Sequence, residues 1–187
     1  GDLGSGSDYT SFLQHLGVPS TDMSSSGNYG VYHSVFDNFQ WYKKFADPDF
    51  AYSQEMARAY GLEVLRMSET DVLPFDYETY GKEISEYLES ARKKSWTAFG
   101  DQGPDFQLAQ VAAERFTLAG TAVAAVQRDP KSDRAQLNRL LSQTERALLL
   151  PNGLPNRPWF RHSVYAPGEY TGYAAVVIPG VNEAIDA

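Results

Sequence analysis

The hydrophobic pattern separates a first part of mixed short elements from a second part that predicts long helices. In residues 76–98, 104–128 and 132–149, hydrophobic side chains recur at steps of three and four, the spacing of one helix face. Asp76 is placed to cap the first of these helices, and the segment GDQGP ends it. We therefore expect a mainly α fold built around a helical bundle.

The predicted helix 104–128 is hydrophobic on nearly every side. Its main stripe is formed by Phe106, Ala109, Ala113, Phe116, Val123 and Val126. Leu108, Val111, Leu118 and several alanines occupy the remaining faces. A helix of this kind lies at the centre of a bundle or against another subunit. We expect a homodimer that forms through the helical region, with this helix in or near the interface.

The first 70 residues predict shorter elements. A short helix around Phe12 should end at Gly17, and VYHSV at 31–35 predicts a strand or extended segment. Asp47 and Pro48 open a further helix, whose Phe50, Ala57, Tyr60, Val64 and Met67 predict one buried face. After residue 150 the chain is rich in proline and aromatic residues, and a last helix should begin at Pro179.

Composition narrows the possible partners. The net charge of -8 argues against nucleic acid, and we interpret the basic run Arg92, Lys93 and Lys94 as a solvated helix face. The absence of cysteine excludes thiol catalysis, disulfides and cysteine-ligated zinc. No hydrophobic run is long enough to span a bilayer, so no membrane contact is expected from these residues. The chain opens on a glycine-rich turn without methionine, so we expect it to be part of a longer protein.

The sequence alone contains no complete catalytic or metal site. Of its three histidines, His33 lies among eight aromatic rings in residues 29–50, where it either packs or forms one arm of a site completed elsewhere. No two histidines have the spacing of a helical zinc motif. The segment GSGS at 4–7 is interpreted as a tight turn, and Arg157 and His162 as structural residues of a packed loop.

Four segments together give the chain a resemblance to a known family. LGSGSDYTSFLQHLGV, VYHSVFDNFQWYKKFADPDF, VLPFDYETY and NGLPNRPWFRHSVYAP resemble the C-terminal part of the glutamate carboxypeptidase II (NAALADase) and transferrin receptor family. The resemblance implies that residues 1–70 are the C-terminal remnant of an α/β zinc-exopeptidase catalytic domain. Residues 71–187 would be a transferrin receptor-like helical dimerisation domain.

The resemblance also implies roles for Tyr32 and His33 in the YHS segment. His33 matches the last ligand of a two-zinc centre, and Tyr32 matches a tyrosine that hydrogen-bonds the tetrahedral intermediate. Tyr32 could equally be a core aromatic residue. The family's other zinc ligands and its catalytic glutamate precede the first residue of this chain. We therefore expect two zinc ions in the parent enzyme, none in this fragment, and a fragment that is inactive by itself.

Four further residues match substrate-binding positions. Ser5, Gly6 and Ser7 match a substrate-pocket loop, and Tyr173 matches a tyrosine that contacts the terminal glutamate of the substrate. The carboxypeptidase has a lysine before that tyrosine, whereas this chain has Gly172, and its arginine patch is also missing. Buried substrate carboxylates would lack cations. Glutamate specificity is therefore not supported.

Three hypotheses for function remain. The leading one is a homodimerisation module of a zinc-dependent glutamate carboxypeptidase-like exopeptidase. The first alternative is a piece of an intact dinuclear zinc peptidase that hydrolyses C-terminal residues from peptides. The second is a non-catalytic, receptor-like homologue, although retention of His33 favours the metallopeptidase branch. As an alternative to the structural role of Arg157 and His162, the resemblance implies that their loop lies over the partner's active site. The resemblance suggests a membrane-anchored, secretory or vacuolar parent.

Overall fold

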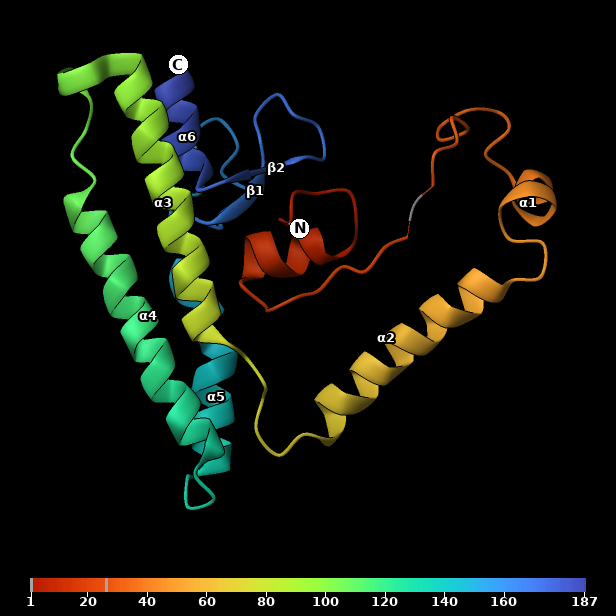
Figure 1. The fold of residues 1–187 in the computed structure, drawn as a ribbon, viewed down its shortest axis with the longest axis horizontal. Coiled ribbons are helices and arrows are strands. Elements are labelled where there is room, and N and C mark those ends of the chain that lie inside the picture. The colour runs from red at the N-terminus through yellow and green to blue at the C-terminus, as the bar shows by residue number, and fades with distance from the viewer. Residues whose placement is uncertain (1, 26) are drawn as a thin grey trace. The chain divides into compact units, whose positions relative to one another are not determined.

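The computed structural model describes residues 2–25 and 27–187, which form two units (Figure 1). The larger unit combines the residues up to Asp22 with Val72–Ala187, and the smaller unit is Met23–Asp71. Helices dominate, and the described residues contain one sheet of two strands. The prediction of a mainly α fold is confirmed. None of the helices in the described ranges is long and apolar enough to cross a membrane.

The larger unit is built around helices from the second half of the chain. Its helices are α3 (Tyr77–Phe99), α4 (Gln107–Arg128), α5 (Arg134–Thr144) and α6 (Pro179–Asp186). The 3-10 turns Gly100–Gln102 and Glu145–Leu148 follow α3 and α5. Strands β1 (Tyr165–Pro167) and β2 (Ala175–Val177) pair antiparallel, with Ala166 opposite Val176. The three predicted long helices and the short last helix beginning at Pro179 are therefore confirmed.

Helices α3 and α4 lie side by side as an antiparallel pair (Figure 1). Two glycines bring their backbones close together. A Cβ on Gly81 would collide with Thr117, and one on Gly120 would collide with the backbone of Tyr77 and Glu78. Only glycine fits at such close helix contacts, so these two positions fix how the helices pack.

The core of the larger unit lies where α3, α4 and α6 meet. It consists of Leu88, Ala91, Phe106, Ala113, Ile178 and Ile185, with Ile84 and Tyr87 packed against it. An aromatic group extends it towards α5, because Phe116 meets Tyr77 and Tyr80 edge to face. Burial of these side chains supplies the main driving force for folding of this unit.

The short N-terminal helix forms as predicted. It includes the π-helical segment Ser11–His15 and ends at Gly17, whose φ of 63° is left-handed. Gly17 donates to the Leu13 carbonyl at 3.1 Å, and Val18 donates to the Phe12 carbonyl at 2.9 Å. These two hydrogen bonds close the helix at Gly17. Glycine adopts the left-handed conformation required there without strain.

The smaller unit contains α1 (Phe39–Trp41), the π-helical segment Tyr42–Ala46 and α2 (Ala51–Glu69). The predicted strand at 31–35 is wrong. These residues form turns, with Ser34 donating to the Val31 carbonyl at 2.9 Å and His33 at φ 60°. A left-handed residue interrupts an extended segment, and no described strand of this unit is available to pair with one.

The prediction of a buried face on α2 is also wrong, because no residue of α2 is buried. Within the described part of Met23–Asp71, Asp47 is the only buried residue. Its carboxylate accepts from the backbone N–H of Tyr52 at 3.2 Å and of Ser53 at 2.9 Å. The helix starts at Ala51 and not at Pro48, so Asp47 is not its N-cap residue as predicted, and its carboxylate instead reaches N–H groups of the first turn from further upstream.

Candidate functional site

Tyr32 and His33 form an exposed pair in the smaller unit. Their rings stack with centroids 3.8 Å apart, and the backbone N–H of His33 donates to Asp37 Oδ2 at 3.4 Å. No described protein group hydrogen-bonds either imidazole nitrogen. The imidazole therefore packs against one ring without being enclosed in a core, and its nitrogens are available to a ligand.

The described residues do not assemble a metal centre around His33. No group of three or more His, Asp or Glu residues in residues 2–25 and 27–187 could hold a metal ion. A catalytic zinc ion uses three protein ligands and an open position. The donors present near His33 do not fit a complete zinc site.

The four sequence-predicted substrate residues lie together in the larger unit. Ser5 donates its backbone N–H to the Tyr173 carbonyl at 2.8 Å, which joins the N-terminal turn to the loop between β1 and β2. Gly6 has φ 110°, and a Cβ there would lie 3.0 Å from Tyr173 Cγ. Ser7 continues the same turn and accepts from Thr10. Tyr173 itself is 61% exposed, so the ring faces solvent beside a closely approaching backbone.

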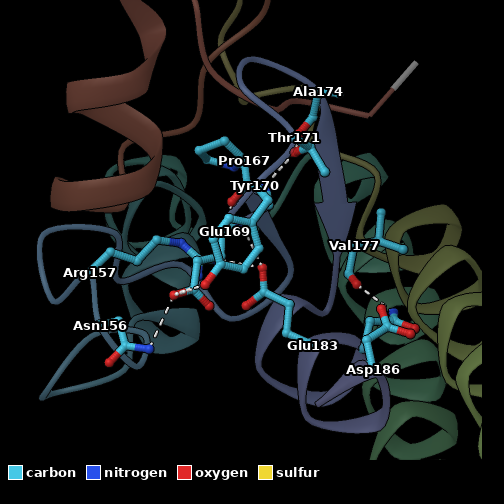
Figure 2. Close-up of polar contacts among 12 residues, drawn as sticks. Asn156, Arg157, Pro167, Glu169, Tyr170, Thr171, Ala174, Val177, Glu183 and Asp186 are labelled. Carbon is cyan, nitrogen blue, oxygen red and sulfur yellow. Dashed lines mark hydrogen bonds and ion pairs between the residues drawn. The ribbon is translucent and has the colours of Figure 1, made fainter.

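The loop that carries Tyr173 is braced at both ends (Figure 2). Thr171 Oγ1 donates to the Ala174 carbonyl at 2.8 Å and closes the loop on itself. At its base, Arg157 Nη2 donates to Glu183 Oε1 at 2.7 Å and to the Pro167 carbonyl at 3.1 Å. Sequence reasoning did not identify Glu183, because nothing in the local pattern links α6 to a loop 26 residues earlier.

A second polar cluster surrounds the buried His162. Its Nε2 lies 2.8 Å from Glu145 Oε1, and the Tyr80 hydroxyl donates to the same oxygen at 3.1 Å. Burial, followed by the charge of Glu145, raises the pKa of Tyr80, and burial raises the pKa of Tyr165 to about 12. Both phenols therefore stay protonated at neutral pH and serve as hydrogen-bond donors or packing groups.

A cavity of about 470 Å³ opens beside this cluster. Its lining includes the carboxylates of Asp76, Glu83 and Glu145 and several aromatic rings, without lysine or arginine among the described lining residues. Such a lining repels anions. The cavity is therefore unsuited to the carboxylate of a peptide substrate.

One face of α4 is exposed and, apart from Arg115, apolar. This α4 outer face consists of Leu108, Val111, Arg115, Leu118, Ala122 and Ala125, all exposed. The fractional exposure of Leu108 is 85% and that of Leu118 is 70%. On the opposite side, Ala113 and Gly120 are buried. Large exposed leucines in a row are typical of a surface that another protein covers.

Comparison with known families identifies the helical region. The transferrin receptor-like dimerisation domain matches residues 90–187, slightly more than half of the chain. This range contains the whole of α4 and α6, the 3-10 turns and the two strands.

Comparison with curated proteins extends the similarity over the remaining residues. A probable glutamate carboxypeptidase of Arabidopsis thaliana is 37% identical over 98% of this chain, and one of Arthroderma benhamiae is 33% identical over 100%. An aminopeptidase of Rattus norvegicus is 31% identical over 89% of the chain. The chain spans only 27%, 27% and 24% of the lengths of these three relatives. The chain therefore belongs to the glutamate carboxypeptidase-like family and carries its transferrin receptor-like dimerisation domain.

Proposed function

We propose that this chain is the homodimerisation module of a zinc-dependent glutamate carboxypeptidase-like exopeptidase. Residues 71–187 act as the dimerisation domain, and residues 1–70 are the C-terminal remnant of the catalytic domain. The observation that carries the proposal is the α4 outer face, which lies inside the matched dimerisation domain and exposes Leu108 and Leu118. Covering two such side chains is worth about 1.5 to 3 kcal/mol each.

The partner is a second copy of the same chain. Helix α4 already buries Ala113 and Gly120 on the side that packs against α3. Its outer face is not covered by any other part of the described fold of one copy. A helix that is apolar on both sides occupies the middle of an assembly. A homodimer places two such helices at its centre and removes both outer faces from water.

In the parent protein, His33 serves as one ligand of a two-zinc centre and Tyr32 as a hydrogen-bond donor to the oxyanion. The exposed, unbonded imidazole supports the first role. Ser5, Gly6, Ser7 and Tyr173 bind the peptide substrate, and the hydrogen bond between Ser5 and Tyr173 supports a shared site. One imidazole cannot hold two zinc ions, so this chain alone is inactive.

Light scattering on the 187-residue chain tests dimerisation. The expected mass is twice 20.8 kDa, and Leu108→Asp is expected to give a monomer because it buries two unpaired carboxylates in the interface. Leu140→Asp is the matched control, since Leu140 is 55% exposed but lies on α5. Its dimer should persist. A wild-type monomer at micromolar concentration would overturn the proposal.

Zinc analysis of the same sample separates the module from an enzyme piece. The module should contain no stoichiometric zinc and should not hydrolyse a dipeptide. Two zinc ions per chain together with hydrolysis would instead establish a working dinuclear site and refute the inactive module.

A further inference from the structure

The α4 outer face follows a seven-residue repeat. Its positions alternate steps of three and four: Leu108, Val111, Arg115, Leu118, Ala122 and Ala125. Hydrophobic positions with an average spacing of 3.5 residues form a seam between two helices that wrap around each other. The packed side of α4 uses a different set, with Ala113 and Gly120 also seven residues apart. Helix α4 therefore presents to solvent a second seam of this spacing, hydrophobic at every position except Arg115.

Side-chain size changes along this seam. The large side chains Leu108 and Val111 lie in its first half, and the small side chains Ala122 and Ala125 lie in its second half. Two parallel copies would set large against large at one end and leave a gap at the other. Antiparallel copies set Leu108 against Ala125. They also set Val111 against Ala122, so the outer layers each join a larger and a smaller side chain, as dense packing requires, while the central layer joins Arg115 and Leu118.

We propose that α4 pairs antiparallel with α4 of a second copy, about a two-fold axis beside Arg115 and Leu118. This inference rests on the proposed dimerisation and specifies its contact. The surface at a two-fold interface must be complementary to itself. The change from large side chains at one end of the seam to small ones at the other meets that requirement when the copies are antiparallel. The seam from Leu108 to Ala125 is about 26 Å long at 1.5 Å per residue.

The residues beside the axis support the same orientation. Within the described residues, neither Glu114 nor Arg115 forms an ion pair, although both are exposed. In the antiparallel pair, Arg115 of one copy faces Leu118 of the partner subunit and reaches Glu114 of the partner subunit. Symmetry forms this ion pair twice. Ala112 and Ala119 flank the seam and let the two backbones approach closely.

Disulfide mapping tests the orientation, because the chain has no native cysteine. Chains carrying Leu108→Cys are mixed with chains carrying Ala125→Cys, oxidised mildly and separated without reductant. The expected product is a 108–125 disulfide between chains, identified by mass spectrometry of the joined peptides. Each single variant alone should cross-link at least ten-fold more slowly. Leu140→Cys on α5, mixed with Leu108→Cys, is the control and should stay unlinked.

Two results would overturn the inference, and light scattering on the same samples distinguishes them. A dimer in which Leu108→Cys cross-links to itself faster than to Ala125→Cys has a parallel seam, and a dimer with none of these cross-links uses another surface. Either result would refute the antiparallel pairing of α4 but would still agree with the proposed dimerisation. A monomer in light scattering would refute both the antiparallel pairing and the proposed dimerisation.

Discussion

His162 donates its Nε2 proton to Glu145 Oε1 across 2.8 Å, and the opposite edge of its ring fixes this direction. The backbone N–H groups of Val164 and Tyr165 lie 3.2 and 3.0 Å from His162 Nδ1. A backbone N–H can only donate, so Nδ1 must be the acceptor and the proton must reside on Nε2. His162 is 0% exposed, which makes this neutral ring a bridge between the loop before β1 and the turn that follows α5.

Replacing His162 by alanine should destabilise the larger unit strongly. The change removes the hydrogen bond from His162 to the buried carboxylate of Glu145 and takes away the acceptor of two backbone N–H groups, and we expect a loss of about 3 kcal/mol in the free energy of unfolding. Urea denaturation followed by circular dichroism measures it. His15→Ala is the control, because it loses a ring stack on Trp159 and one exposed hydrogen bond, worth about 1 kcal/mol. Equal losses would refute the bridging role of His162.

Gly120→Ala should separate α3 from α4. Its added Cβ meets the backbone of Tyr77 and Glu78, which cannot rotate away, so we expect a loss of about 1 to 3 kcal/mol despite the better helix propensity of alanine. Gly180→Ala on α6 is the matched control, because its Cβ would meet only Leu154 at 3.8 Å. Thermal unfolding should show a lower melting temperature for the first variant only. A neutral Gly120→Ala would mean that the helices do not pack this closely.

The cap of α3 should contribute stability that depends on pH. Hydrogen bonds from the backbone and side chain of Thr79 lower the pKa of Asp76 below its usual value. A lowered folded-state pKa adds stability above the unfolded value of about 3.9, and this stability is lost as the pH falls through the folded pKa. Asp76→Ala should cost about 1 kcal/mol at pH 7 and less at pH 2.

Asp76→Asn provides the comparison for that measurement. Asparagine caps a helix without titrating, so its stability relative to alanine should stay constant between pH 7 and pH 2. Urea midpoints of the three proteins across this range measure both effects. An Asp76→Ala cost that does not shrink on acidification would contradict the role of the ionised carboxylate.

Reversing one charge beside the proposed axis should weaken the dimer. Arg115→Glu sets like charges against each other at two symmetric places, and we expect a rise of about ten-fold in the dimer Kd. Adding Glu114→Arg to the same chain restores opposite charges and should recover most of the affinity. Sedimentation at several concentrations gives the Kd values. Arg139→Glu on α5 is the control, and a similar loss there would point to a general charge effect.

Local signals were enough to predict the long helices and their ends. Asp76, Gly17 and Pro179 act through hydrogen bonds or backbone angles within a few residues of themselves. The helix ends that they mark can therefore be predicted from the adjacent sequence. The exposure of α4 was also predictable, because Leu108 and Leu118 lie outside its main stripe. Two sets of hydrophobic or small residues repeat along α4, and they predict both its packed face and the α4 outer face.

Contacts between distant segments were not predictable from local pattern. The Ser5–Tyr173 hydrogen bond joins opposite ends of the chain, and only the family resemblance linked these two residues, as substrate-binding positions, without indicating their contact. The Arg157–Glu183 pair left no sequence signal at all. The strand at 31–35 was mispredicted for a related reason, since β propensity favours a strand only where a neighbouring strand exists to accept its hydrogen bonds.

The burial of Asp47 has a consequence for the whole of Met23–Asp71. The only buried residue in the described part of this segment is the acidic residue Asp47. Polar contacts therefore order the segment, and the hydrophobic effect contributes little. Its backbone amides can open to solvent without exposing a core. Deuterium should therefore enter α2 far sooner than α3, whose Leu88 and Ala91 are sealed beneath other helices.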